Sequence, residues 1–125
     1  KVREAVEYAT GKTLKRPTSV QAKDYGDGLK DIDFEPVIGA QKGHGYPPRS
    51  YSGLPYVPQE GDVIVIQDTS KSRAGHMAIY AGKNSSGREI WISDFIQQRG
   101  PYPGESYRAE KPAYVIYRYR SRRQS

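Results

Sequence analysis

Two short apolar runs, residues 63–66 (Val-Ile-Val-Ile) and 77–80 (Met-Ala-Ile-Tyr), set the strongest limit on how this chain can fold. Only 35% of its 125 residues are hydrophobic, so the core has to be assembled around such concentrated runs. Each run has the length of a buried strand and falls far short of the roughly 20 apolar residues of a membrane-spanning helix. The sequence therefore predicts a single domain over residues 1–125 and no membrane span, since domains most often contain about 100–150 residues.

The first part of the chain predicts helices. Apolar residues at positions 2, 5, 6 and 9 follow the i, i+3, i+4, i+7 spacing of an amphipathic helix, and a glycine follows as a stop signal. We therefore expect a helix over residues 1–10 and a second, short helix over residues 20–29, whose C-terminal half is weakened by a Gly-Asp-Gly sequence. The first helix has no N-capping residue of its own and the chain does not start with Met, so we expect further residues before Lys1.

The second part of the chain predicts a sheet. Residues 38–58 are rich in glycine and proline, which favours a long loop. Short apolar runs separated by turns then predict strands over residues 62–67, 76–81, 89–93 and 113–119. Helices followed by an antiparallel sheet indicate the α+β class.

Charge and cysteine content narrow the function. A formal net charge of +6 favours an anionic partner, such as nucleic acid, a membrane surface or an anionic wall polymer. The last residues, 120–125, are interpreted as a basic tail. The absence of cysteine excludes disulfides, thiolate metal ligands and a thiol nucleophile within these 125 residues.

His76 is the first candidate for catalysis, because it follows Gly75 at the start of a predicted buried strand. A histidine in that position lies at a sheet edge or a cleft mouth, where a nucleophile can reach its ring. With a pKa of about 6.5 when unperturbed, histidine is the usual general base near neutral pH. The alternative is a histidine that merely ends a turn.

A histidine base needs a partner that orients its ring. Asp94 directly follows the strand predicted over residues 89–93 and is the best candidate, although it could also be an ordinary aspartate at a strand end. Asn84 and Asp68 are weaker candidates, because turn chemistry alone explains them.

Other kinds of site receive little support. His44 lies in the long loop, and two histidines without an HExxH-like spacing make a zinc hydrolase unexpected. Neither a phosphate-binding glycine motif nor a Gly-x-Ser-x-Gly elbow is present. We therefore expect no metal and no cofactor.

Several segments, taken in order, resemble the CHAP family, the cysteine, histidine-dependent amidohydrolases/peptidases of the wider NlpC-type papain-like superfamily. The strongest resemblance is a Gly-Asp-Val strand within residues 59–66, followed after a loop by a Gly-His strand over residues 75–82 that ends in glycine. Residues 2–7 and 22–26 are similar to the first helix and the segment after it. Residues 91–98 look like those of a subgroup found among secreted or interbacterial wall hydrolases.

The resemblance implies a papain-like fold, with N-terminal helices packed on a small antiparallel sheet. It implies a hydrolase that cleaves an amide bond of the peptidoglycan peptide stem, as an endopeptidase or an N-acetylmuramoyl-L-alanine amidase. His76 would be the base and Asp94 its orienting partner, while the nucleophilic cysteine would fall a few residues before Lys1. Without that cysteine, this chain alone is expected to be inactive.

The resemblance also sets expectations for location and partners. The protein would be secreted and would act in the periplasm or the extracellular wall, with peptidoglycan as substrate and an immunity or inhibitor protein as a partner. Trp91, Tyr25 and His44 are the residues predicted to contact substrate, although core packing is an alternative for the aromatic ones. Two other functions stay open: a noncatalytic wall-binding module of the same fold, and a small basic domain that binds nucleic acid.

Overall fold

A computed structural model describes residues 2–49 and 52–120, so residues 121–125 of the predicted basic tail lie outside the described residues. Helices dominate the start of the chain and strands dominate the rest, as the α+β prediction requires. In chain order the elements are α1 (Val2–Thr10), the 3₁₀ turn η1 (Ala22–Asp24), α2 (Gly26–Asp31), β1 (Phe34–Ala40), β2 (Val63–Ile66), β3 (His76–Lys83), β4 (Glu89–Ile92), β5 (Ile96–Gln97), α3 (Glu105–Glu110) and β6 (Tyr114–Tyr119).

Within the described residues, the strands form one antiparallel sheet in the order β1-β6-β2-β3-β4-β5. The four strands that the sequence predicts are confirmed as β2, β3, β4 and β6, which occupy the middle of the sheet. At one end of the central pair, His76 of β3 lies opposite Ile66 of β2. The catalytic candidate therefore lies where a buried strand begins.

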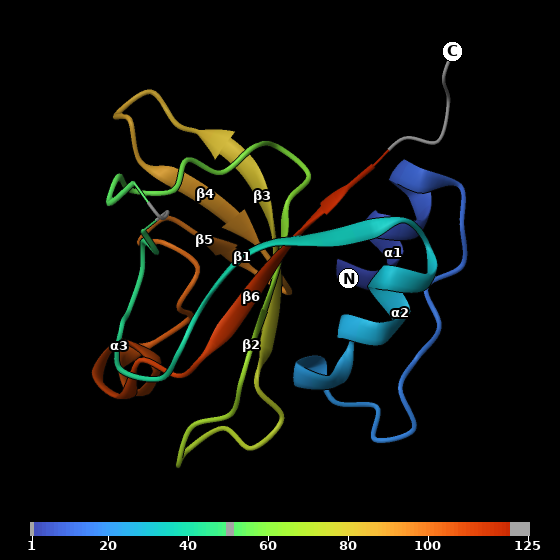
Figure 1. Ribbon diagram of the computed structural model, residues 1–125, viewed down its shortest axis with the longest axis horizontal. Helices are drawn as coiled ribbons and strands as arrows, with labels where there is room; N and C mark the ends of the chain where they lie inside the picture. The colour runs from blue at the N-terminus through green and yellow to red at the C-terminus, as the bar shows by residue number, and fades with distance from the viewer. Residues whose placement is uncertain (1, 50–51, 121–125) are drawn as a thin grey trace.

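Both faces of the sheet are covered, which explains why all four residues of β2 are buried. Val63 and Val65 belong to a cluster that includes apolar residues of α1 and α2. Ile64 and Ile66 belong to a second cluster, which includes aromatic residues from β4, β6 and α3. Figure 1 shows the corresponding layers, with α1 and α2 on one side of the sheet and α3 on the other.

The helix predicted over residues 1–10 is confirmed as α1, but the one predicted over residues 20–29 is split into η1 and α2. The expectation that glycine weakens its second half was wrong, since α2 begins at Gly26 and includes Gly28. A Cβ on Gly26 would lie 2.5 Å from the hydroxyl oxygen of Tyr117, and one on Gly28 would lie 2.9 Å from a backbone oxygen. Close packing therefore accounts for both glycines.

Part of the loop predicted over residues 38–58 is a strand. β1 pairs along β6, with Ile38 opposite Ile116 and a shift of register between Pro36 and Ile38. β1 is an edge strand, and an edge tolerates proline because one side of the strand has no ladder partner. The sequence does not predict α3 or β5 either, since six and two residues are too few to show a periodic pattern.

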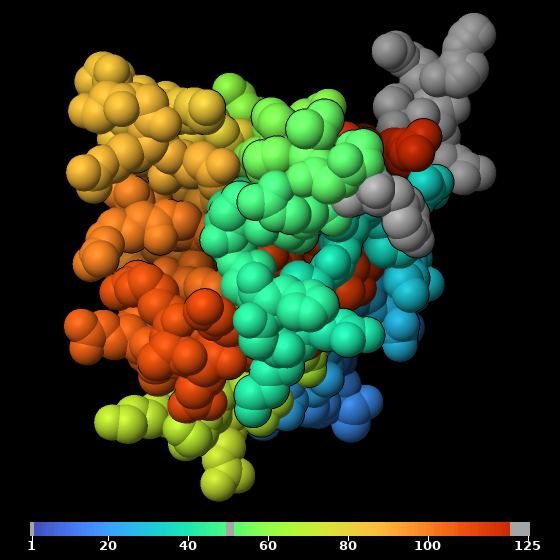
Figure 2. Space-filling view, turned by 60° about the vertical axis from the view of Figure 1, so that its left-hand side comes forward, coloured from blue at the N-terminus to red at the C-terminus, as the bar shows by residue number. Residues whose placement is uncertain are grey.

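The described part of the remaining loop, after β1, is tied to the end of the chain that contains α3 and β6. The backbone N–H of Gly43 donates to the carbonyl oxygen of Lys111 at 2.8 Å, and the hydroxyl of Tyr114 donates to the carbonyl oxygen of Gly45 at 2.7 Å. Figure 2 shows this cyan-to-green segment lying against the orange-red segment that contains α3. No helix in residues 2–49 and 52–120 is long and apolar enough to cross a membrane.

Candidate active site

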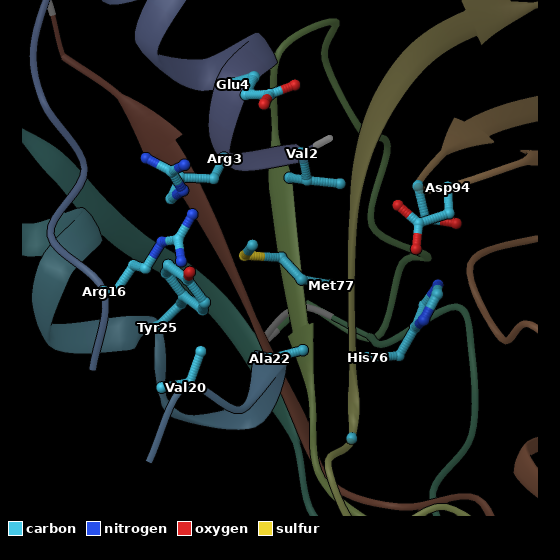
Figure 3. Close-up of a pocket in the computed structure, with 12 residues that line it drawn as sticks. Val2, Arg3, Glu4, Arg16, Val20, Ala22, Tyr25, His76, Met77 and Asp94 are labelled. Atoms are coloured by element: carbon cyan, nitrogen blue, oxygen red, sulfur yellow. The ribbon is translucent and has the colours of Figure 1, made fainter. Parts of the chain in front are cut away.

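A pocket of about 430 Å³ lies on the helical side of the sheet and includes His76 among its walls. Its other walls come from the first turn of α1, the segment that leads into η1, and the turn after β4. Figure 3 shows His76 and Asp94 on one side of the pocket, and Arg3, Arg16 and Tyr25 on the opposite side. The pocket thus brings together residues from four separate parts of the chain.

The glycine before His76 is required by the backbone at that point. Gly75 has φ +71°, in the left-handed region that favours glycine. A Cβ there would collide with the carbonyl oxygen of Ile66 and would lie 2.6 Å from the Cβ of Lys23. The backbone N–H of Lys23 also donates to the carbonyl oxygen of Ala74 at 2.9 Å, so η1 is fixed to the turn that positions His76. Gly75 therefore allows the tight turn that positions His76.

The imidazole of His76 is held by Gln97 of β5. Its Nε2 lies 2.8 Å from Oε1 of Gln97, and the same Oε1 accepts a hydrogen bond from the hydroxyl of Ser93 at 2.9 Å. The amide nitrogen of Gln97 donates to the carbonyl oxygen of Pro101 at 2.7 Å, which sets the orientation of the amide. Because Oε1 can only accept, Nε2 of the neutral imidazole carries the proton and Nδ1 carries the free lone pair. The structure therefore defines which nitrogen can act as a base.

Burial lowers the pKa of His76, and this effect exceeds two opposing ones. The hydrogen bond with Gln97 and the negative charge of Asp94 both favour the imidazolium and raise the pKa. The ring also packs beside Phe95 and Tyr107, with centroid distances of 6.1 and 6.0 Å. These contacts keep the neutral imidazole, which is the form a general base needs, in a fixed position near pH 7.

The predicted site residues are only partly brought together. Asp94 and Tyr25 line the pocket with His76, as the sequence suggests. However, the hydrogen bond expected from Asp94 to the imidazole is made by Gln97, so Asp94 acts on His76 through its charge. Gln97 was not predicted as a site residue, because its only signal in the sequence is a polar residue that follows Phe95 and Ile96 shortly after the aspartate.

The other two residues predicted to contact substrate lie elsewhere. Trp91 has an exposed fraction of 0%, and its indole N–H donates to Glu89 at 3.0 Å in the cluster on the far face of the sheet. A fully buried side chain cannot touch substrate, so this prediction is wrong and the core-packing alternative holds for Trp91. His44 is exposed in the loop after β1 and is not among the residues that line the His76 pocket.

Metal binding finds no support in the described residues. Within residues 2–49 and 52–120, no group of three or more histidine or carboxylate side chains is arranged to hold a metal ion. The pocket instead combines an imidazole held through its Nε2 with the N-terminal end of α1, which provides Val2, Arg3 and Glu4 as lining residues. Such a set suits proton transfer next to a nucleophile.

Helices α1 and α2 cover one face of the antiparallel sheet, and a histidine stands at the head of a central strand with a polar side chain on its Nε2. This arrangement is that of the papain-like fold class. No protein-family model matches the chain, and no curated protein matches it. Solved structures do match the chain. The native type VI effector-immunity complex Tae3-Tai3 from Ralstonia pickettii contains a chain with 41% sequence identity and a TM-score of 0.71, and the match covers 94% of this chain and 78% of that one.

The selenomethionine form of the same Ralstonia pickettii complex gives similar values: 40% identity, a TM-score of 0.67, and coverage of 92% of this chain and 79% of that chain. Identity at this level over most of both chains goes beyond a shared fold. The chain belongs to the Tae3 family of type VI effectors.

Proposed function

We propose that this chain is the catalytic domain of a cell-wall amidase effector, which hydrolyses an amide bond in the peptide stem of peptidoglycan by a cysteine-histidine mechanism of the CHAP and NlpC type. Membership of the Tae3 effector family supports the effector role. The oriented imidazole of His76 in an open pocket supports amide hydrolysis. The expected bond is that of an endopeptidase or an N-acetylmuramoyl-L-alanine amidase.

The observation that carries this proposal is the position of the N-terminal end of α1, which lines the same pocket as His76. A cysteine at a helix N-terminus has a lowered pKa, because the helix dipole and free backbone N–H groups favour the thiolate. The same N–H groups can stabilise the oxyanion of a tetrahedral intermediate. The 125 residues contain no cysteine, so we place the proposed nucleophile in the chain that precedes Lys1.

In the proposed reaction, Nδ1 of His76 takes the thiol proton and the thiolate sulfur forms a bond to the carbonyl carbon. The imidazolium then gives its proton to the amide nitrogen, the carbon-nitrogen bond breaks, and the amine leaves. Water attacks the resulting thioester while His76 takes one of its protons, which releases the acid and regenerates the thiol. Gln97 positions the ring throughout, and Asp94 stabilises the imidazolium.

Digestion of purified peptidoglycan tests the proposal, with protein that includes the residues before Lys1. His76→Ala should abolish the release of fragments, and Asp94→Ala should weaken it by about tenfold. His44→Ala is the matched control, because this exposed histidine lies outside the pocket and its loss should leave the rate unchanged. Full activity of the His76 variant would show that His76 is not the base. Mass spectrometry of the released fragments identifies the bond that is cut.

One observation favours a second function. Because the described fold needs no cysteine within its 125 residues, the same domain could bind the wall without cutting it. The sequence of the full gene product distinguishes the enzyme from the wall-binding module. A cysteine within about ten residues before Lys1 supports the enzyme, and its absence supports the noncatalytic wall-binding module.

Effector function implies a place of action and a partner. We propose that the protein acts in the periplasm of a target cell, and that a cognate immunity protein blocks the His76 pocket, since its relatives occur in effector-immunity complexes. Expression with a periplasmic signal should be toxic, expression without one should not be, and a co-expressed immunity protein should restore growth. Equal toxicity in both compartments would count against the wall as target.

A further inference from the structure

Two arginines line the pocket on the side opposite His76. Arg3 comes from the first turn of α1, and Arg16 comes from the segment between α1 and η1. Figure 3 shows both guanidinium groups on the side of the pocket that carries Tyr25, with Asp94 and His76 on the other side. One end of the pocket thus carries two arginines, the other end carries Asp94 beside His76, and Glu4 of α1 lines the pocket as well.

Arg16 is available to a ligand. Its side chain is exposed, and it forms no hydrogen bond or ion pair with another residue in the described parts of the chain. Arg3 uses one nitrogen to donate to Glu7 at 3.0 Å, which leaves its other donors free. Arginine presents its donors in a planar fork that matches a carboxylate.

Glu7 holds the side chain of Arg3 and anchors the backbone near Arg16. Oε2 of this carboxylate accepts from Arg3 at 3.0 Å and from the backbone N–H of Leu14 at 2.9 Å. Leu14 is buried in the core, so the backbone two residues before Arg16 is anchored to α1. The entropy cost of ordering Arg3 and this backbone is therefore already met before a ligand binds.

We infer that Arg3 and Arg16 form an anion subsite that binds a free carboxylate of the substrate peptide, next to the amide that the His76 side of the pocket attacks. This inference rests on the proposed function, because it takes the peptide stem as the ligand of the pocket. Peptides that carry a free carboxylate are therefore the preferred substrates, and their amidated counterparts are poor ones.

Binding of muropeptides to the 125-residue chain tests this inference. Because the chain contains no cysteine, it cannot turn the peptide over by the proposed thiol chemistry during a calorimetric titration. The probes are muropeptides with free carboxyl groups and the same muropeptides with those groups converted to primary amides. We expect the carboxylate form to bind about tenfold more tightly, and Arg16→Gln to remove that preference.

Lys15→Gln provides the matched control. It removes the same charge from the neighbouring exposed position, which does not line the His76 pocket, so the preference should remain. Equal binding of both muropeptides by the unaltered chain overturns the subsite, as does an equal effect of the Lys15 and Arg16 variants. A separate measurement tests the proposed function: if that function is wrong, the cysteine-containing protein does not hydrolyse peptidoglycan.

Discussion

Replacing Gln97 by Met removes every hydrogen bond of the amide while keeping a side chain of similar length. The buried carbonyl oxygen of Pro101 then loses the donor at 2.7 Å, and the hydroxyl of Ser93 keeps only a long hydrogen bond to the carbonyl oxygen of Phe95 at 3.4 Å. A buried polar group left unsatisfied costs about 1–3 kcal/mol, so the loss at Pro101 alone should lower the free energy of unfolding by about 1–3 kcal/mol. Nε2 of His76 loses its acceptor in the same step.

The pKa of His76 supplies an independent readout of the same substitution. Because the hydrogen bond with Gln97 favours the imidazolium, its removal should move the pKa of His76 further down. An NMR titration of the imidazole protons in a His44→Gln background follows this group alone, since the chain contains two histidines. Urea unfolding of the same protein gives the change in stability.

Gln98→Met is the matched control for this experiment. It makes the same chemical change one position along, where the side chain is exposed and forms one hydrogen bond, with Asn84 at 3.3 Å. Its effect on stability should stay within about 0.5 kcal/mol. If Gln97→Met costs no more than Gln98→Met, or if the pKa of His76 rises, Gln97 does not hold the imidazole.

Three further outcomes are expected from urea unfolding. Gly75→Ala should lower the free energy of unfolding by about 3 kcal/mol or more, because the new Cβ collides with its neighbours and the residue has a positive φ. At Gly87 the φ is similar but the space is open, so Gly87→Ala should cost about 1 kcal/mol. Equal losses for the two variants would contradict this reasoning. Arg118→Met should cost about 3–5 kcal/mol, because it leaves Asp62, which is 1% exposed, as an unpaired buried charge; a loss below about 1 kcal/mol would refute that. Burial lowers the pKa of His76 below its unfolded value of about 6.5. As the pH falls, the unfolded state therefore binds the proton before the folded state does. The stability that this group contributes is lost as the pH drops below about 6.5. The His76→Gln variant should lack that part of the pH dependence, and an identical slope in both proteins would argue against a buried neutral imidazole.

The sequence predicts the parts of this fold that depend on neighbouring residues. The periodic apolar residues of α1 and the short runs of β2 and β3 are local patterns, and the structure confirms them. Edge strand β1 escaped prediction because its last residues, 38–40, were assigned to a loop, and only its pairing with β6 makes it a strand. Trp91 was misassigned for a related reason, since its burial depends on the layer that covers the far face of the sheet.

The features of the candidate site can likewise be separated into local ones and ones that depend on the tertiary structure. From sequence alone, a histidine after a glycine at the head of an apolar strand identifies the proposed base, because the chemistry of His76 and the start of a strand are both local properties. Only the tertiary structure selects Gln97, 21 positions further along, as its hydrogen-bond partner, and places Arg16 across the pocket. Hydrogen bonds and opposed charges between distant segments leave no periodic trace in a sequence, because they depend on how the strands pair and on where the helices pack.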